Sequence, residues 1–198
     1  MPRKPRHSIE NLTDRALQQF WVHGFYATSM DDLVRTTEVS RHGIYGAYGG
    51  KEALFLACFE RYRDTVVTPA FAQVEAQGAD LKSVAQYFEQ QITLAETFGL
   101  PGPGCFVANS TTEIAPENAQ VRAKVTEHHE RLQRGFANAL RNSRKPDHVL
   151  KETEIDGLAY SMVIFTNGLW SMSRLVDRGD VLRRSATLYL TCLEGQLG

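Results

Sequence analysis

The sequence predicts an all-α fold in two parts. Apolar residues recur at spacings of three and four along most of the 198 residues, and no run shows the alternation that is typical of a half-buried strand. Short helical segments come first and longer ones follow. Hydrophobic residues make up 42% of the chain, so it can bury a core without a disulfide or a structural metal.

The short segments carry their own start and stop signals. We expect helices over residues 8–23, 30–37 and 41–47. Gly24 ends the first, since glycine adopts the left-handed backbone that closes a helix. Ser29 and Asp32 have the capping-box spacing that opens the second, and Ser40 is the N-cap candidate of the third. Three such segments are typical of a helix-turn-helix module, with its turn at residues 36–40.

The rest of the chain is expected to form longer helices. Lys51 opens a fourth helix, which Pro69 ends or kinks. A loop rich in glycine and proline at residues 99–104 breaks the chain. Further helices are expected over residues 80–98, 105–114, 116–143, 152–176 and 180–197. The expected domains are residues 1–52 and 53–198.

Charge is divided unevenly along the chain, although the net charge is only −1. Residues 1–51 hold seven Lys or Arg and five Asp or Glu, and three of those cations lie in the first six residues. Residues 52–198 hold fifteen Lys or Arg and eighteen Asp or Glu. A basic arm on a mildly acidic body indicates that one end meets an anionic partner, with a solvated terminus as the alternative.

The three cysteines, Cys58, Cys105 and Cys192, are odd in number and lie far apart. This usage argues against a disulfide framework and indicates a reducing compartment. No stretch approaches the roughly 20 consecutive apolar residues of a membrane span, and the basic N-terminus leads into no apolar core of a secretory signal. We therefore expect a cytoplasmic protein with no membrane partner.

The motifs of common enzyme classes are missing from the sequence. It contains no G-x-S-x-G, no phosphate-binding glycine loop, no H-E-x-x-H and no cysteine pair at zinc spacing. His128 and His129 are neighbours, and adjacent residues of a helix point to different sides, so the two cannot hold one ion together. We expect no catalysis, no metal and no cofactor.

Four runs within residues 11–60 carry a family resemblance. They are residues 16–20 (ALQQF), 23–33 (HGFYATSMDDL), 39–45 (VSRHGIY) and 48–55 (YGGKEALF). In one register, they resemble the opening of the TetR/AcrR family of bacterial transcriptional regulators. The resemblance implies a homodimer whose two heads read adjacent major-groove segments of a palindromic operator. It also implies a C-terminal domain that binds a small effector and releases the DNA, so we expect a transcriptional regulator, with repression as the family's commoner mode.

The third short helix is expected to enter the major groove and present side chains to base edges. Arg41 suits either a guanine edge or a phosphate, and Tyr45 matches a family tyrosine that usually contacts the backbone. In the alternative interpretation, Tyr45 is a packing residue and Lys51 is a solvated residue at the start of a helix. The expected DNA contacts are Arg3, Lys4, Arg6, Ser29, Ser40, Arg41, His42, Tyr45 and Lys51.

The same helix departs from the family pattern in two places. His42-Gly43 replaces the common Gly-Thr, and Gly46-Ala47 stands where larger residues are frequent. Each glycine weakens a helix by roughly 1 kcal/mol relative to alanine. These departures motivate an alternative function, a helical small-molecule-binding protein with a weakened or vestigial DNA-binding head.

The helix expected over residues 152–176 has a seam of apolar residues. Ile155, Leu158, Met162, Phe165, Leu169, Met172 and Val176 follow one another at spacings of three and four, the pattern of helices that pack lengthwise. The resemblance favours a four-helix bundle between two copies, while the alternative packs the stripe inside its own subunit. The expected interface residues are Leu158, Met162, Phe165, Leu169, Met172, Tyr189 and Leu193.

The resemblance also places an effector pocket among the longer helices. The expected lining is Tyr87, Phe88, Cys105, Asn109, His128, Tyr160 and Phe165. Such an aromatic lining suits a planar or hydrophobic ligand of unknown identity. Cys105 follows Gly104 at the start of a helix, where backbone N–H groups favour a thiolate. The Gly-Cys pair resembles the oxidant- and electrophile-sensing NemR-like branch, and the alternative is a small buried apolar residue.

An effector, or a modification of Cys105, is expected to act by shifting populations. The free dimer would hold its heads roughly 34–36 Å apart, one turn of DNA. The ligand would change that spacing by binding one state better than the other.

Overall fold

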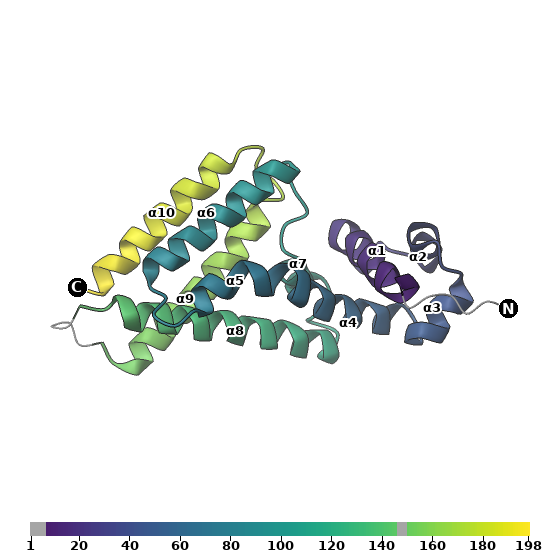
Figure 1. Ribbon diagram of the computed structural model, residues 1–198, viewed down its shortest axis with the longest axis horizontal. Helices are drawn as coiled ribbons and strands as arrows, with labels where there is room; N and C mark the ends of the chain where they lie inside the picture. The colour runs from purple at the N-terminus through teal and green to yellow at the C-terminus, as the bar shows by residue number, and fades with distance from the viewer. Residues whose placement is uncertain (1–6, 146–149) are drawn as a thin grey trace. The chain divides into compact units, whose positions relative to one another are not determined.

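The computed structural model describes residues 7–145 and 150–198, and all regular structure in them is helical (Figure 1). The helices are α1 (His7–His23), α2 (Met30–Thr37), α3 (Arg41–Tyr48), α4 (Lys51–Tyr62), a π-helical segment (Arg63–Val67), α5 (Thr68–Glu75), α6 (Leu81–Phe98), α7 (Phe106–Glu113), α8 (Ala119–Ser143), α9 (Glu152–Met172) and α10 (Gly179–Gln196). The all-α prediction is confirmed. None of these helices has the length and hydropathy that crossing a membrane requires.

The described residues divide into two compact units. Unit 1 contains the chain up to Val67 together with Phe106–Val125, and unit 2 contains Thr68–Cys105 and Thr126–Gly198. The three short helices therefore share a unit with α4, with α7 and with the first turns of α8. The remainder of α8 belongs to unit 2 with α5, α6, α9 and α10.

Unit 1 has an aromatic core between α1, α4 and α7. The Phe55 ring meets Phe20 edge-on at 5.0 Å and Phe106 at 5.2 Å. All three side chains are at most 2% exposed. Edge-to-face pairs of this kind add to the free energy gained from burial. Phe106 is the first residue of α7, so this helix is anchored on α4 at its start.

The predicted caps of the short helices are confirmed. Ser29 accepts a hydrogen bond from the Asp32 N–H, and the Asp32 carboxylate accepts one from the Ser29 N–H, which completes the capping box of α2. Ser40 Oγ accepts from the Gly43 N–H at 3.1 Å and caps α3. Gly24 follows α1 with φ +86°, a left-handed conformation that glycine adopts without strain.

Three expected helix boundaries differ in the structure, and one of them is the helix expected to reach residue 176, which ends at Met172. Pro69 does not simply end the fourth helix: α4 passes into the π-helical segment and Pro69 becomes the second residue of α5. Proline has no N–H to donate and interrupts the regular α-helical hydrogen bonds, and the π-helical segment lies directly before it. α8 begins at Ala119 rather than at Pro116, because Asn118 Oδ1 accepts from the N–H groups of Gln120 and Val121.

Unit 2 is a bundle in which α6 packs against both α5 and α10, as the two neighbouring ribbons of α6 and α10 show (Figure 1). Phe71 of α5 meets Phe136 of α8 edge-on at 5.3 Å. The Phe71 ring lies so close to Gly135 that a methyl group there would come within 2.6 Å of Phe71 Cε1. A larger residue at position 135 would therefore displace the ring from the core.

Candidate nucleic-acid interface and effector region

Helix α3 has one exposed face, and a buried side chain on its other face holds the helix in place. Ile44 is fully buried, while Arg41, His42 and Tyr45 are exposed, and the Tyr45 side chain is 49% exposed. These three predicted contacts therefore lie together on one face of a capped helix. Its residues carry a cation, an imidazole and a phenol, which can donate hydrogen bonds to phosphates and base edges.

Arg41 has an ion-pair partner on the preceding helix. Its Nη2 lies 2.8 Å from Asp31 Oδ1, and both side chains are more than half exposed. Asp32, the next residue, is held by Ser29, and hydrogen bonds from the Ser29 hydroxyl and backbone and from Arg35 lower the pKa of Asp32 to about 2. An exposed pair such as Arg41–Asp31 contributes little free energy, so the guanidinium can exchange Asp31 for a DNA acceptor at small cost.

The two glycines of α3 have different surroundings. A methyl group on Gly43 would lie 2.8 Å from Val39 Cγ1, so glycine leaves room for the half-buried Val39 side chain. A methyl group on Gly46 would meet nothing within 4 Å. Packing therefore explains why position 43 is a glycine, but it does not explain the glycine at position 46.

Ser29 and Lys51, both expected at phosphates, have partners inside unit 1. The Ser29 hydroxyl is engaged with Asp32 at 2.6 Å. Lys51 Nζ donates to the carbonyl oxygens of Phe25, at 2.8 Å, and Thr28, at 2.7 Å. Burial of Lys51 lowers the pKa of its ammonium group. The expected contacts Arg3, Lys4 and Arg6 lie outside the described residues.

Sequence reasoning missed a set of polar contacts around the turn between α1 and α2. Glu113 accepts a hydrogen bond from the Tyr26 N–H at 2.9 Å, and the Tyr26 hydroxyl donates to Glu117 at 3.0 Å. Asn118 donates to Glu52 at 2.5 Å. The partners are 66 to 91 residues apart, so no local spacing could have revealed them.

The expected effector residues are only partly brought together. Tyr87 and Phe88 are buried on α6. Burial, with a smaller contribution from the charge of nearby Cys105, raises the pKa of Tyr87, and the Trp170 side chain hydrogen-bonds to its hydroxyl. Tyr160, by contrast, is 54% exposed.

The other expected lining residues have separate surroundings. Burial is the main cause that lowers the pKa of His128 to about 3, so this histidine is neutral at physiological pH. Phe165 stacks on Tyr189 at 4.1 Å. Asn109 belongs to unit 1, whereas the other six belong to unit 2. Tyr87, Cys105 and Trp170 are thus the neighbours on which an effector hypothesis can rest.

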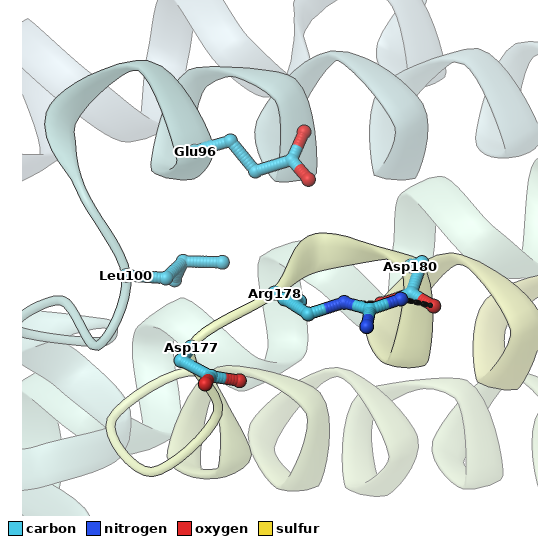
Figure 2. Close-up of a pocket in the computed structure, with 5 residues that line it drawn as sticks. All are labelled: Glu96, Leu100, Asp177, Arg178 and Asp180. Atoms are coloured by element: carbon cyan, nitrogen blue, oxygen red, sulfur yellow. Dashed lines mark hydrogen bonds and ion pairs between the residues drawn. The ribbon is translucent and has the colours of Figure 1, made fainter.

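A hollow of about 260 Å³ opens elsewhere in unit 2, between α6 and the start of α10, as Figure 2 shows. Glu96, Leu100, Asp177, Arg178 and Asp180 line it. Arg178 is paired with Asp180, with 2.8 Å between Nη2 and Oδ2. None of the expected effector residues is among these five. Within the described part of the chain, no group of His, Cys, Asp and Glu is placed to hold a metal ion.

The apolar seam of α9 packs largely inside the chain. Met162, Leu169 and Leu193 are at most 4% exposed, so they are not available to a second copy. Leu158, Phe165 and Tyr189 are half-buried, and Met172 is 49% exposed. Other large apolar side chains are exposed instead: Tyr160 and Ile164 on α9, Leu175 after it, and Val181 and Leu188 on α10. Sequence reasoning did not single out these positions because α9 is apolar on more than one side.

Two family models match the chain. The model described as "Tetracyclin repressor-like, C-terminal domain" matches residues 81–189, and "Bacterial regulatory proteins, tetR family" matches residues 12–58. The chain is 26% identical over 157 residues to the HTH-type transcriptional repressor ComR of Escherichia coli (strain K12), covering 79% of this chain and 74% of that protein. It is 24% identical over 193 residues to the HTH-type transcriptional regulator YezE of Bacillus subtilis (strain 168), covering 91% and 97%.

Solved structures of low sequence identity share the fold. A TetR transcriptional regulator from Chloroflexus aurantiacus J-10-FL matches with a TM-score of 0.81 at 20% identity, over 99% of this chain and 98% of that one. A cysteine mutant of the TetR family regulator CifR, solved with 26-bp double-strand operator DNA, matches at 0.79 and 19% identity, over 96% and 98%. Reduced E. coli NemR matches at 0.75 and 15% identity, over 98% of each chain.

Proposed function

Because the chain belongs to the tetR family of bacterial regulatory proteins, we propose that it represses transcription as a homodimer bound to a palindromic operator. It is a transcriptional regulator and not an enzyme. The observation that carries the proposal is the exposed face of α3, with Arg41, His42 and Tyr45 on a capped helix directly after the turn of a helix-turn-helix. CifR, of the same fold, was solved with operator DNA. A protein that binds operators acts where the genome is, so we place it in the cytoplasm.

Each residue of the face has a proposed task. Arg41 leaves Asp31 for a guanine edge or a phosphate, His42 reads the groove beside it, and Tyr45 donates its hydroxyl to the DNA backbone. Ser29 and Ser40 bring helix N-termini to the phosphates, where free N–H groups favour an anion. The proposed DNA-binding domain is residues 1–52, with Arg3, Lys4 and Arg6 following the DNA as a basic arm.

The homodimer is proposed to form through exposed apolar side chains of α9 and α10. Tyr160, Ile164 and Leu188 are each more than half exposed, and such residues mark an interaction site where they gather in one patch. Met172 and the half-buried residues Leu158, Phe165 and Tyr189 border it in this proposal. Two copies related by a twofold axis would then build the four-helix bundle from residues 53–198.

The effector is proposed to act near Cys105, through binding or through modification of the thiol. Cys105 lies beside the buried Tyr87, and Trp170 hydrogen-bonds to that tyrosine. The Gly102 N–H donates to Ser173 O at 3.1 Å, so the loop before Cys105 is tied to the end of α9. The effector then favours one of two head spacings by binding one state better.

A helical ligand-binding protein with a weakened head is the second candidate. The open space at Gly46 favours it, because an exposed glycine weakens α3 and offers no side chain to a base. The two candidates differ in one property: only the regulator selects a particular DNA sequence.

The test is a selection of genomic fragments by the purified protein at moderate salt, followed by sequencing. An enriched palindrome is expected, and its neighbouring genes would narrow the effector to a chemical class. Recovery of fragments without a shared sequence would contradict the proposal and favour the second candidate. A second selection tests Cys105. The protein is alkylated after Cys192→Ser has removed the exposed thiol, and because Cys58 is buried, the reagent is directed to Cys105.

A further inference from the structure

Two charged residues from distant segments of unit 1 hold the turn between α1 and α2, residues 24–29. This turn connects the helix that packs on α4 with the helix-turn-helix. Ser29, its last residue, is also the N-cap of α2. The backbone of the turn therefore sets where α2 and α3 lie within the unit.

Lys51, the first residue of α4, contacts the turn through its ammonium group. Nζ donates to the carbonyl oxygens of Phe25, at 2.8 Å, and Thr28, at 2.7 Å, and lies 4.1 Å from the centre of the Phe25 ring. An ammonium group has three donors. Two of the three are thus used on backbone, and the aromatic face adds a cation–π attraction.

Glu113, the last residue of α7, contacts the same turn through its carboxylate. Oε1 accepts from the Tyr26 N–H at 2.9 Å. A methyl group on Gly24 would lie 2.6 Å from Oε1 and 2.8 Å from Oε2, so the carboxylate rests directly on the Cα of Gly24. Gly24 has φ +86°, which makes glycine the residue that suits both the backbone and the close approach.

The connection between α7 and α8 adds further contacts to the same region. The Tyr26 hydroxyl donates to Glu117 at 3.0 Å, and Asn118 donates to Glu52 on α4 at 2.5 Å. Asn118 is itself fixed, because its side-chain oxygen caps α8. Several hydrogen bonds therefore fix α7 and the connection that follows it. The bond made by Glu113 is to the backbone of the turn.

We infer that Lys51 and Glu113 are a pair of positioning residues for operator recognition. Lys51 uses its charge on the turn rather than on a phosphate, and Glu113 ties the helix-turn-helix to α7. α7 follows Cys105 along the chain without an intervening residue. The inference rests on the proposed operator binding.

The experiment separates positioning from phosphate contact by comparing two DNA duplexes. The full chain and its variants Lys51→Gln and Glu113→Ala are titrated against the selected operator and against a scrambled duplex of the same length, over a series of salt concentrations. Binding to scrambled DNA comes from charge alone and does not need an oriented head.

The variants are expected to lose sequence selectivity and nothing else. Operator affinity falls about tenfold for each, the scale of one lost hydrogen bond to a charged group. Affinity for scrambled DNA and the slope against salt stay those of the wild type. Glu113→Gln keeps an acceptor for the Tyr26 N–H and is expected to recover most of the affinity, and Glu117→Gln, which alters only the contact with the exposed Tyr26 hydroxyl, is the matched control.

Two results would overturn the inference. One is an unchanged operator affinity in Glu113→Ala or, if the alanine variant does not fold, an unchanged operator affinity in Lys51→Gln. The other is a Lys51→Gln variant whose salt slope falls by about one per head with weaker binding to both duplexes, the signature of a lost phosphate contact. A wild-type protein with no preference for the operator over the scrambled duplex would instead contradict the proposed function itself.

Discussion

Two clusters of charged side chains, one in each unit of the molecule, have different partners. In unit 1, Lys51 and Glu113 bind backbone groups of one turn. In unit 2, Arg183 pairs with Glu89 and Glu96 on α6, and Glu96 also accepts a hydrogen bond from the Gly179 N–H at the start of α10. The cluster of unit 1 therefore fixes the main chain that leads to α3, whereas the cluster of unit 2 joins two helices through partly exposed ion pairs, which contribute little free energy.

The strongest test of this comparison removes one aromatic ring from each core. Phe55→Ala deletes a ring that is 1% exposed and contacts Phe20, Phe25 and Phe106. We expect it to lower the free energy of unfolding by about 3–5 kcal/mol, measured in urea. Phe88→Ala, equally buried in unit 2, is the control. A loss below about 1 kcal/mol for Phe55→Ala would show that the ring does not hold the unit 1 core.

The pH dependence of stability is expected to reside partly in unit 2. Burial lowers the pKa of His128 from 6.5 to about 3, so the unfolded chain binds this proton first as the pH falls. The contribution is complete above about pH 6.5 and is lost towards pH 3, by up to about 1.4 kcal/mol per pH unit.

Urea unfolding at pH 7.5, 6.5 and 5.5 measures this slope, and His128→Gln should reduce it. His42→Gln, the same substitution at an exposed position of unit 1, is measured beside it for comparison. Equal slopes in wild type and His128→Gln would mean that the His128 ring takes up its proton as readily in the folded protein as in the unfolded chain.

The two glycines of α3 offer a smaller, paired test within unit 1. Gly46→Ala should raise stability by about 1 kcal/mol, because the site is open and alanine favours the helix. Gly43→Ala should lower stability by about 1 kcal/mol, because its methyl group meets Val39. Thermal unfolding of both variants measures these changes in stability. A Gly43→Ala variant that is more stable than the wild type would show that Val39 moves aside without cost.

The smallest effect is expected at the ion pairs of unit 2. Arg183→Ala removes contacts with Glu89, Glu96 and Thr93. We expect the unfolding midpoint to shift by no more than about 3 °C, the scale of a partly exposed pair in a chain of this size. A larger shift would remove the contrast between the two units.

The sequence predicted the short helices well because their signals are local. Ser29, Asp32, Ser40 and Gly24 each act within four residues of their own position, and all four have their expected roles. The exposed face of α3 was predicted for the same reason. Contacts such as Tyr26–Glu113 join residues 87 positions apart, and periodicity carries no information on them.

The interior of unit 2 was harder to predict for a different reason. The spacing of Met162 and Leu169 correctly indicates a packed seam, but it does not say whether the same chain or a second copy covers it. The structure buries both residues within the chain. Tyr160 and Ile164, which remain exposed, lie on a helix that is apolar on more than one side, so the sequence pattern did not separate its exposed apolar residues from its buried ones.

The central claim, that α3 reads an operator, is tested most directly by the affinity of Arg41→Gln for the selected operator across a salt series. We predict that the wild type prefers the operator to scrambled DNA and that its affinity falls steeply with salt. Arg41→Gln should bind several-fold more weakly while unfolding at the same temperature, since its ion pair with Asp31 is exposed. A variant that binds the operator as tightly as the wild type would contradict the account.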